Sequence, residues 1–331
     1  MNIPYLKQLL LTAGGLLITE ESLRSHLILC LSAEGTPRQR PLGVPDNIGV
    51  NSDTIGDIKP ECFFFFDVKT YQEESLEAFS RIKSIIGDDV PVTMDYSSTE
   101  IPDGSIAYHR IFGVITFDSK WYFSTRRFEQ DLLAAESNPA IIAHLLHVSS
   151  GGGESYYLDR LSETMRSLTK PVVVLIEQAC GSAAYYISCH STHIFSLTAN
   201  DMIGCIGTMT RVYNDDGWFE KAGIKRFDIN SSLSPRKNKV FNDAENGNTE
   251  EYVKRFLDPA ARQFIDEVRA ARKQLSKLPD DDPLLQGETY RADESIERGL
   301  IDGLMTMEEA IGLAHRLGMD TRKVNNLASS L

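Results

Sequence analysis

Apolar and polar positions alternate in blocks beyond residue 100, and these blocks predict alternating strands and helices. Short apolar runs such as residues 171–176 are typical of buried strands, whereas apolar residues every three or four positions are typical of amphipathic helices. The expected strands are residues 105–116, 140–148, 171–176 and 193–197, and the expected helices are residues 123–136, 154–168, 183–190 and 249–277. Strands that alternate with helices form parallel sheets with crossover helices. Residues 101–320 are therefore predicted to form an α/β domain.

The first hundred residues lack this regular alternation. A short helix is expected over residues 5–17, four consecutive phenylalanines at residues 63–66 resemble a buried strand, and residues 71–86 have helical apolar spacing. We therefore predict an N-terminal α+β extension over residues 1–100, to which the sequence assigns no chemistry. At the other end, residues 321–331 are expected to form a flexible tail.

Composition and charge place the chain among soluble globular proteins. Its 331 residues are 42% hydrophobic and 24% charged, and a net charge of −13 argues against a nucleic-acid partner. The longest apolar run near the N-terminus, residues 9–19, is interrupted by two glycines and is too short to span a bilayer. Five cysteines without metal-type spacing fit a reducing compartment. We expect a cytoplasmic protein with no membrane anchor, metal or cofactor.

Ser182 is the most informative residue for function. It follows an expected strand, is flanked by the small residues Gly181 and Ala183, and immediately precedes an expected helix. Free N–H groups and the dipole at a helix N-terminus stabilise developing negative charge. The glycines of residues 149–153, Ser-Ser-Gly-Gly-Gly, can direct backbone amides at a ligand. This pair of junctions indicates acyl transfer, although a serine at a helix start is most often only an N-cap.

Four separate blocks together resemble the signal peptide peptidase A (protease IV) family. They are residues 149–153, 181–188, 203–207 (Ile-Gly-Cys-Ile-Gly) and 299–303 (Gly-Leu-Ile-Asp-Gly), which occur in the order seen in that family. The resemblance implies a ClpP/crotonase-like fold. Ser150 replaces the family's proline, and Ala183-Ala184 replace two glycines, which could narrow the cleft beside the nucleophile and alter substrate preference more than chemistry.

The resemblance also implies a serine–lysine dyad. A serine hydroxyl needs a neighbouring base, and a lysine serves as one only when its pKa falls from ~10.4 toward ~7–8. The family's lysine follows the third block, where this chain has Lys237, with Lys239 as the alternative. The oxyanion would be held by the backbone N–H groups of Ala183 and of Gly152 or Gly151.

Other polar residues are weaker candidates. In the family, polar residues near the third block help to hold the lysine, which makes Thr208 a candidate for that role. His190 lies roughly two helical turns beyond Ser182, a poor position for a base. Cys189, His190 and His193 lack a fourth ligand at suitable spacing for zinc.

The implied activity is that of a serine endopeptidase that cleaves polypeptides through an acyl-enzyme on Ser182. Family members form homo-oligomers, some of which combine serine and lysine from neighbouring subunits. The long N-terminal extension also resembles phage or prophage capsid-associated members, which process head proteins and would be virion-associated; signal and membrane peptides are the other substrate class. Two alternatives stay open: a crotonase-type acyl-CoA enzyme, and a non-catalytic assembly or scaffold protein.

Overall fold

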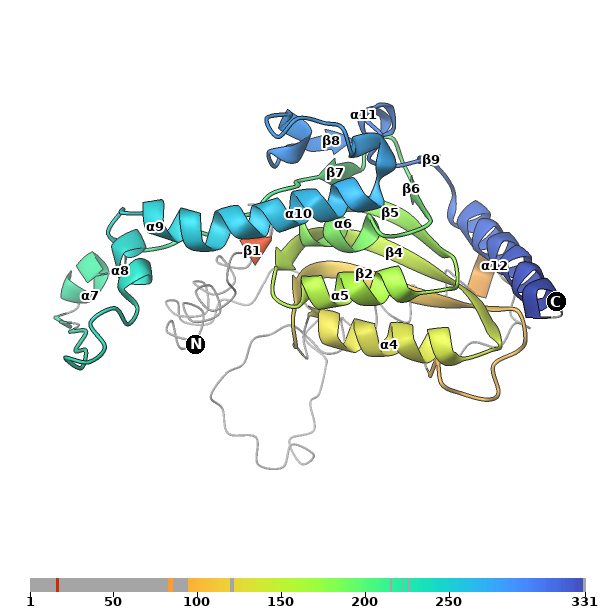
Figure 1. The fold of residues 1–331 in the computed structure, drawn as a ribbon, viewed down its shortest axis with the longest axis horizontal. Helices are drawn as coiled ribbons and strands as arrows, with labels where there is room; N and C mark the ends of the chain where they lie inside the picture. Colours follow the sequence, from red (N-terminus) through yellow and green to blue (C-terminus); the bar gives the residue numbers. More distant parts are fainter. Residues whose placement is uncertain are drawn as a thin grey trace, which may run out of the picture.

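A mostly parallel β-sheet forms the centre of the molecule (Figure 1). The computed structural model describes residues 16–17, 83–85, 95–119, 122–214, 216–221, 223–225 and 227–329. The sheet order is β3-β2-β4-β5-β6-β9. These strands are β2 (Ser105–Thr116), β3 (Phe123–Ser124), β4 (Ile141–Glu154), β5 (Val172–Gly181), β6 (His193–Ser196) and β9 (Gly303–Leu304). Each pairs in parallel with its neighbour, so the predicted α/β architecture is confirmed.

Helices cover both faces of this sheet. One face packs against α4 (Thr125–Ser137), α5 (Leu158–Ser167), α6 (Ala183–Ser188) and α10 (Asp258–Ala271), and the other against α12 (Met307–Ser329). Successive side chains of a strand point to opposite faces, so Val174 of β5 joins the first core and Leu175 joins the second, with Ala310 of α12. Burial on both faces explains why the strands are continuous apolar runs in the sequence.

A smaller layer extends the sheet beyond β5. The short strand β7 (Met202–Gly204) pairs in parallel with the end of β5 and antiparallel with β8 (Thr289–Arg291), which leads into α11 (Ala292–Glu297). Two short 3-10 helices, Lys273–Leu275 and Pro283–Leu285, connect α10 to this layer. Asp302 closes the unit because it accepts hydrogen bonds from the backbone N–H of Ile194 (2.8 Å) and from Arg272 (2.6 Å).

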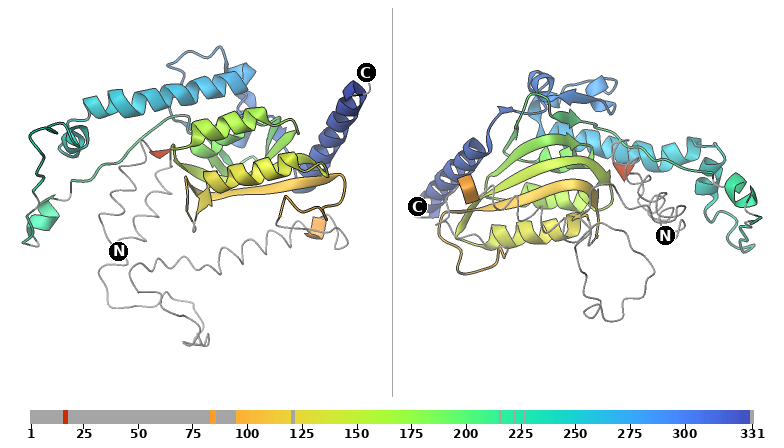
Figure 2. Two further views of the ribbon diagram at one scale, coloured as in Figure 1. Left: turned by 60° about the horizontal axis from the view of Figure 1, so that its bottom comes forward. Right: turned by 180° about the vertical axis from the view of Figure 1, so that it is seen from behind.

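Between β7 and α10 the chain leaves the sheet and forms a projecting arm, residues 208–257 (Figures 1 and 2). The arm contains α7 (Asp216–Lys221) and α8 (Lys239–Glu245), and returns through α9 (Glu250–Tyr252) and a π-helical turn (Val253–Leu257) that run directly into α10. Phe241, Tyr252 and Phe256 pack against one another and join α8 to the returning helical segment. The predicted helix at residues 249–277 therefore exists, but α10 ends at Ala271.

Other sequence expectations also differ from the structure. β4 continues through Gly151–Gly153 to Glu154 instead of ending at a glycine turn, and α5 begins only at Leu158. The residues expected to form a loose tail after Asp320 are helical as far as Ser329. Leu16–Leu17 form a strand, β1, instead of the end of a helix.

Most expectations for the N-terminal extension lie outside the described residues, including the phenylalanine run and most of the expected helix over residues 71–86. Residues 83–85 are helical.

The path of β4 has a clear physical cause. Gly152 pairs with Val114 and Gly153 pairs with Ile115 of β2. A Cβ added at Gly153 would lie 1.9 Å from the carbonyl oxygen of Ile115, so only glycine permits this close approach. The glycines are therefore part of the sheet.

Candidate active site

Ser182 occupies a sharp turn between β5 and α6. Its backbone has φ 54° and ψ −122°, a region that residues with a side chain rarely adopt. The turn is held because the N–H of Ser182 donates to Gly204 O (2.9 Å) and its carbonyl accepts from Tyr186 N (2.9 Å). Strained backbone of this kind clusters at functional sites, where the surrounding structure enforces it.

The structure separates Ser182 from an ordinary helix cap. An N-cap serine accepts a hydrogen bond from an N–H in the first helical turn, but among the described contacts the Ser182 side chain makes no such cap bond. Its residue is 1% exposed. The hydroxyl is thus held at the start of α6 without capping the helix.

Cys205 is a neighbour of Ser182 that sequence reasoning missed. Its thiol is hydrogen-bonded with the Ser182 side chain; burial raises the pKa of the thiol, and this hydrogen bond opposes the rise. Cys205 has φ 54°, and its N–H donates to Glu288 O (2.7 Å). The available signal was its place in the third sequence block, but the contact depends on the pairing of β5 with β7.

The candidate oxyanion donors lie at the same edge of the sheet. Ser150 pairs with Cys180, which sets the glycines of β4 alongside the end of β5. The N–H of Gly152 donates to Ser150 Oγ (3.1 Å), and that hydroxyl donates to Gly113 O (2.6 Å). Ala183 is fully buried at the first position of α6, where an N–H has no acceptor within the helix.

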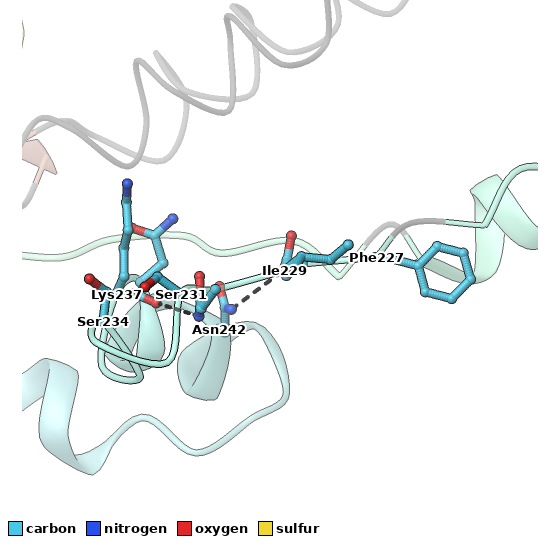
Figure 3. Close-up of a pocket in the computed structure, with 9 residues that line it drawn as sticks. Phe227, Ile229, Ser231, Ser234, Lys237 and Asn242 are labelled. Carbon is cyan, nitrogen blue, oxygen red and sulfur yellow. Dashed lines mark hydrogen bonds between the residues drawn. The ribbon is translucent and has the colours of Figure 1, made fainter.

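Lys237 lies in a different part of the molecule. It is exposed in the loop before α8, at a hollow of about 290 Å³ that is also lined by Ser231, Ser234 and Asn242 (Figure 3). Its carbonyl accepts from Asn230 Nδ2 (3.4 Å), and its N–H donates to Ser234 O (3.2 Å). Figures 1 and 2 place α8 far out on the arm, away from α6. A single chain does not bring Lys237 to Ser182, so the dyad stays a prediction.

Lys239, the alternative base, and Thr208, the residue expected to position the lysine, both make other contacts. Lys239 Nζ lies 2.6 Å from Asp243 Oδ2 on α8. Thr208 Oγ1 donates to Leu257 O (2.9 Å), which fastens the two ends of the arm together. Thr208 therefore contacts the stem of the arm and not the loop that carries Lys237.

The two histidines that follow α6 lie beside carboxylates. His190 Nε2 is buried 3.4 Å from Glu267 without a hydrogen-bond partner among the described residues, and His193 Nδ1 lies 3.6 Å from Asp302. Within the described part of the chain, no group of three or more His, Cys, Asp or Glu side chains could hold a metal ion. None of the described helices has both the length and the apolar character required to cross a membrane.

Residues 164–319 match the family model described as Peptidase family S49. The match covers somewhat less than half of the chain, and over these residues the chain is similar to peptidase family S49. The S49 segment contains Ser182, Cys205, the whole arm and the fourth sequence block, so the resemblance to the signal peptide peptidase A family is confirmed.

Two curated relatives illustrate the similarity. The chain is 25% identical over 201 residues to an Enterococcus faecium protein named "Putative signal peptide peptidase SppA", which covers 58% of this chain and 56% of that protein. It is 26% identical over 196 residues to Protease 4 of Haemophilus influenzae, covering 56% of this chain and 30% of that protein. The chain thus spans about half, or less, of the length of these relatives.

The chain is also similar to solved structures. One is an enoyl-CoA hydratase/isomerase family member (TM-score 0.37, 14% identity), covering 70% of this chain and 83% of that one. Another is an enoyl-CoA hydratase/carnithine racemase from Magnetospirillum magneticum (TM-score 0.35, 12% identity), covering 62% of this chain and 70% of that one.

Proposed function

We propose that the chain is a serine endopeptidase in which Ser182 is the nucleophile and Lys237 the general base. The observation that carries this proposal is the strained, buried turn at Ser182 within the S49 segment. Ser182 Oγ attacks the peptide carbonyl carbon while its proton passes to the neutral amine of Lys237. The tetrahedral intermediate collapses, and the lysine returns the proton to the leaving amine. A water deprotonated by the same lysine then hydrolyses the ester.

Two backbone amides would stabilise the tetrahedral oxygen. The N–H of Ala183 is directed from the start of α6, and the N–H of Gly152, or of Gly151, comes from β4. Gly152 currently donates to Ser150 Oγ (3.1 Å), so a substrate oxygen would compete with that hydroxyl for the amide. Each such donor typically contributes ~10²–10³ in rate.

Lys237 would come from the arm of a neighbouring subunit. The arm carries large apolar side chains that are almost fully exposed, with Phe227 at 75%, Ile229 at 91% and Leu233 at 92%. Burying this surface against a second copy is favourable. Such a contact would also remove the lysine amine from water, which favours its neutral, basic form.

Lys237 is favoured over Lys239 by the contacts of the two amines. Lys239 Nζ is already paired with Asp243 Oδ2 of the same helix at 2.6 Å. Phage head proteins and signal or membrane peptides stay the two predicted substrate classes.

Labelling with a fluorophosphonate probe and cleavage of unfolded casein test this proposal. We expect the wild type and Lys239→Ala to label and cleave, and Ser182→Ala and Lys237→Ala to do neither. Cleavage that survives Ser182→Ala would show that Ser182 is not the nucleophile and would overturn the dyad. A wild type that neither labels nor cleaves would favour the non-catalytic scaffold.

A further inference from the structure

One edge of β4 beside the candidate active site is occupied by the chain's own N-terminal region. β4 pairs with β2 as far as Gly153, but its pairing with β5 ends at Ser150↔Cys180. The last residues of β4 therefore have an edge that β5 leaves open. β1 fills this edge in antiparallel register, with Leu16 opposite Glu154 and Leu17 opposite Gly153.

The side on which β1 lies follows from the pairing. A strand has two hydrogen-bonding edges, and at Gly153 one of them is taken by Ile115 of β2. β1 must use the other edge, which faces the side of β5, where β5 ends at Gly181 and Ser182 follows. In Figures 1 and 2 the red arrow of β1 lies at this end of the strands.

This edge is the place that an extended peptide would need for attack by Ser182. Peptides commonly bind by adding a strand to an open sheet edge, where main-chain hydrogen bonds supply the affinity. A peptide on the β4 edge would bring its carbonyl groups toward the glycine amides and the turn at Ser182. We propose that the N-terminal segment at Leu16–Leu17 occupies the substrate-binding edge and holds the peptidase in an autoinhibited state. This inference rests on the proposed function.

The chemistry of the occupant and its surroundings agrees with a peptide-binding edge. Residues 8–19 contain no charged side chain. Beside Glu154, Phe117 packs edge-on against Tyr156 with ring centroids 4.7 Å apart, and Tyr156 is 57% exposed. Glu154 itself accepts the N–H of Phe117 (2.7 Å). An exposed aromatic surface next to a carboxylate favours an uncharged apolar peptide over an acidic one, so the edge should select uncharged apolar peptide substrates.

Inhibition by a tethered segment is displaceable. A tether gives its segment a high effective concentration at the site, and that concentration falls as the tether lengthens. Here the chain between β1 and β2 is long, from Leu17 to Ser105. We therefore expect the segment to lower the activity by about 10-fold without abolishing it.

The full-length Leu17→Pro variant tests the inference, with Leu17→Val as its matched control. Proline removes the backbone N–H and is excluded from paired strand interiors, whereas valine keeps the N–H and favours strands. We expect Leu17→Pro to raise the rates of fluorophosphonate labelling and casein cleavage by about 10-fold, and Leu17→Val to change them less than twofold. Equal rates in the wild type and Leu17→Pro would overturn the autoinhibition.

A synthetic peptide of residues 8–20 provides a measurement that does not depend on the variant's folding. Added to the wild type, it should slow labelling of Ser182 in a concentration-dependent way, whereas the same peptide with proline at the position of Leu17 should not. If both peptides are without effect while Ser182 labels normally, the autoinhibition fails and the proposed peptidase stands. If no protein labels at Ser182, including Leu17→Pro, the proposed function itself fails.

Discussion

The end of β5 and the projecting arm are built in opposite ways. Ser182 is 1% exposed, held by backbone hydrogen bonds on both sides, and surrounded by strands β4, β5 and β7. In the arm, Lys237 is exposed, and Ile229 and Leu233 are 91% and 92% exposed. Ser182, the proposed nucleophile, is therefore held by contacts within one chain, whereas Lys237, the proposed base, lies on an exposed arm. On the proposed function, this contrast predicts that assembly of the site controls activity.

The largest effect is expected from removing the lysine. Lys237→Ala should lower kcat by ~10²–10⁴, the usual contribution of a general base. Its thermal unfolding should stay near that of the wild type because the side chain is exposed. Casein cleavage and thermal unfolding measure the two effects.

Lys239→Ala is the matched control. It removes an exposed i,i+4 ion pair with Asp243, which typically contributes ~0.3–0.5 kcal/mol to stability, and should leave kcat within about twofold. The reverse pattern, with Lys239 essential and Lys237 dispensable, would assign the base to Lys239.

Adding one methyl group to β4 and one to the arm should change the free energy of unfolding in opposite directions. In Gly153→Ala the new Cβ would lie 1.9 Å from Ile115 O, so we expect a loss of ~3 kcal/mol or more in the free energy of unfolding. Gly217 of α7 in the arm has no atom within 4 Å of an added Cβ, and Gly217→Ala should stabilise by up to ~1 kcal/mol. Urea denaturation measures both. Similar values for the two variants would show that β4 is not packed as described.

Acid should destabilise the sheet through its histidines. Burial and the neighbouring His144 hold the pKa of His109 well below its usual value, and burial with Arg166 lowers the pKa of His190 to about 4. Below pH ~6.5 these histidines bind protons in the unfolded chain but stay neutral in the folded protein. The free energy of unfolding therefore falls as the pH decreases. The slope is up to ~1.4 kcal/mol per pH unit for each histidine.

The arm contains no histidine, so this dependence of the free energy of unfolding on pH arises from histidines in the rest of the chain. Urea denaturation between pH 7 and pH 5 should show it, and His190→Asn should reduce it. A free energy of unfolding that is constant over this range would contradict the buried, neutral state of these rings.

The smallest effect on stability is expected from the exposed tip of the arm. Leu233→Asp should change the free energy of unfolding by less than ~0.5 kcal/mol, because the side chain is 92% exposed in a single chain. If this surface joins subunits, dilution should inactivate both proteins. The variant should then lose its activity at a higher protein concentration than the wild type does. Sedimentation velocity measures the assembly directly. Unchanged assembly and activity would remove Leu233 from the interface.

The sequence predicts those elements whose burial produces a local pattern of apolar residues. The strand at residues 105–116 was predicted at its observed bounds, and α6 begins at the expected Ala183. The helix expected over residues 123–136 is α4, which is capped by Ser124, because the Ser124 hydroxyl accepts the N–H of Arg127. Apolar runs that are buried on both faces give a strong signal of this kind.

The errors arose where two distant segments meet. The strand expected over residues 140–148 leaves Gly152 and Gly153 outside the sheet, but both pair with β2, whose close approach requires glycine at position 153. The contact between Cys205 and Ser182 depends on the pairing of β5 with β7, and β1 depends on an edge that β5 leaves open. The spacing of residues within one segment does not predict pairings between distant segments. The candidate base follows a family resemblance, and no single-chain contact supplies it.

Mixing two inactive variants tests the shared site most directly. Ser182→Ala and Lys237→Ala proteins, unfolded together and refolded in equal amounts, would form some sites with an intact serine from one subunit and an intact lysine from its neighbour. If the site is shared across a head-to-tail contact, the mixture should recover roughly a quarter of the wild-type cleavage rate. A mixture that stays as inactive as its components, while refolded wild type regains full activity, would contradict a serine and lysine contributed by different subunits.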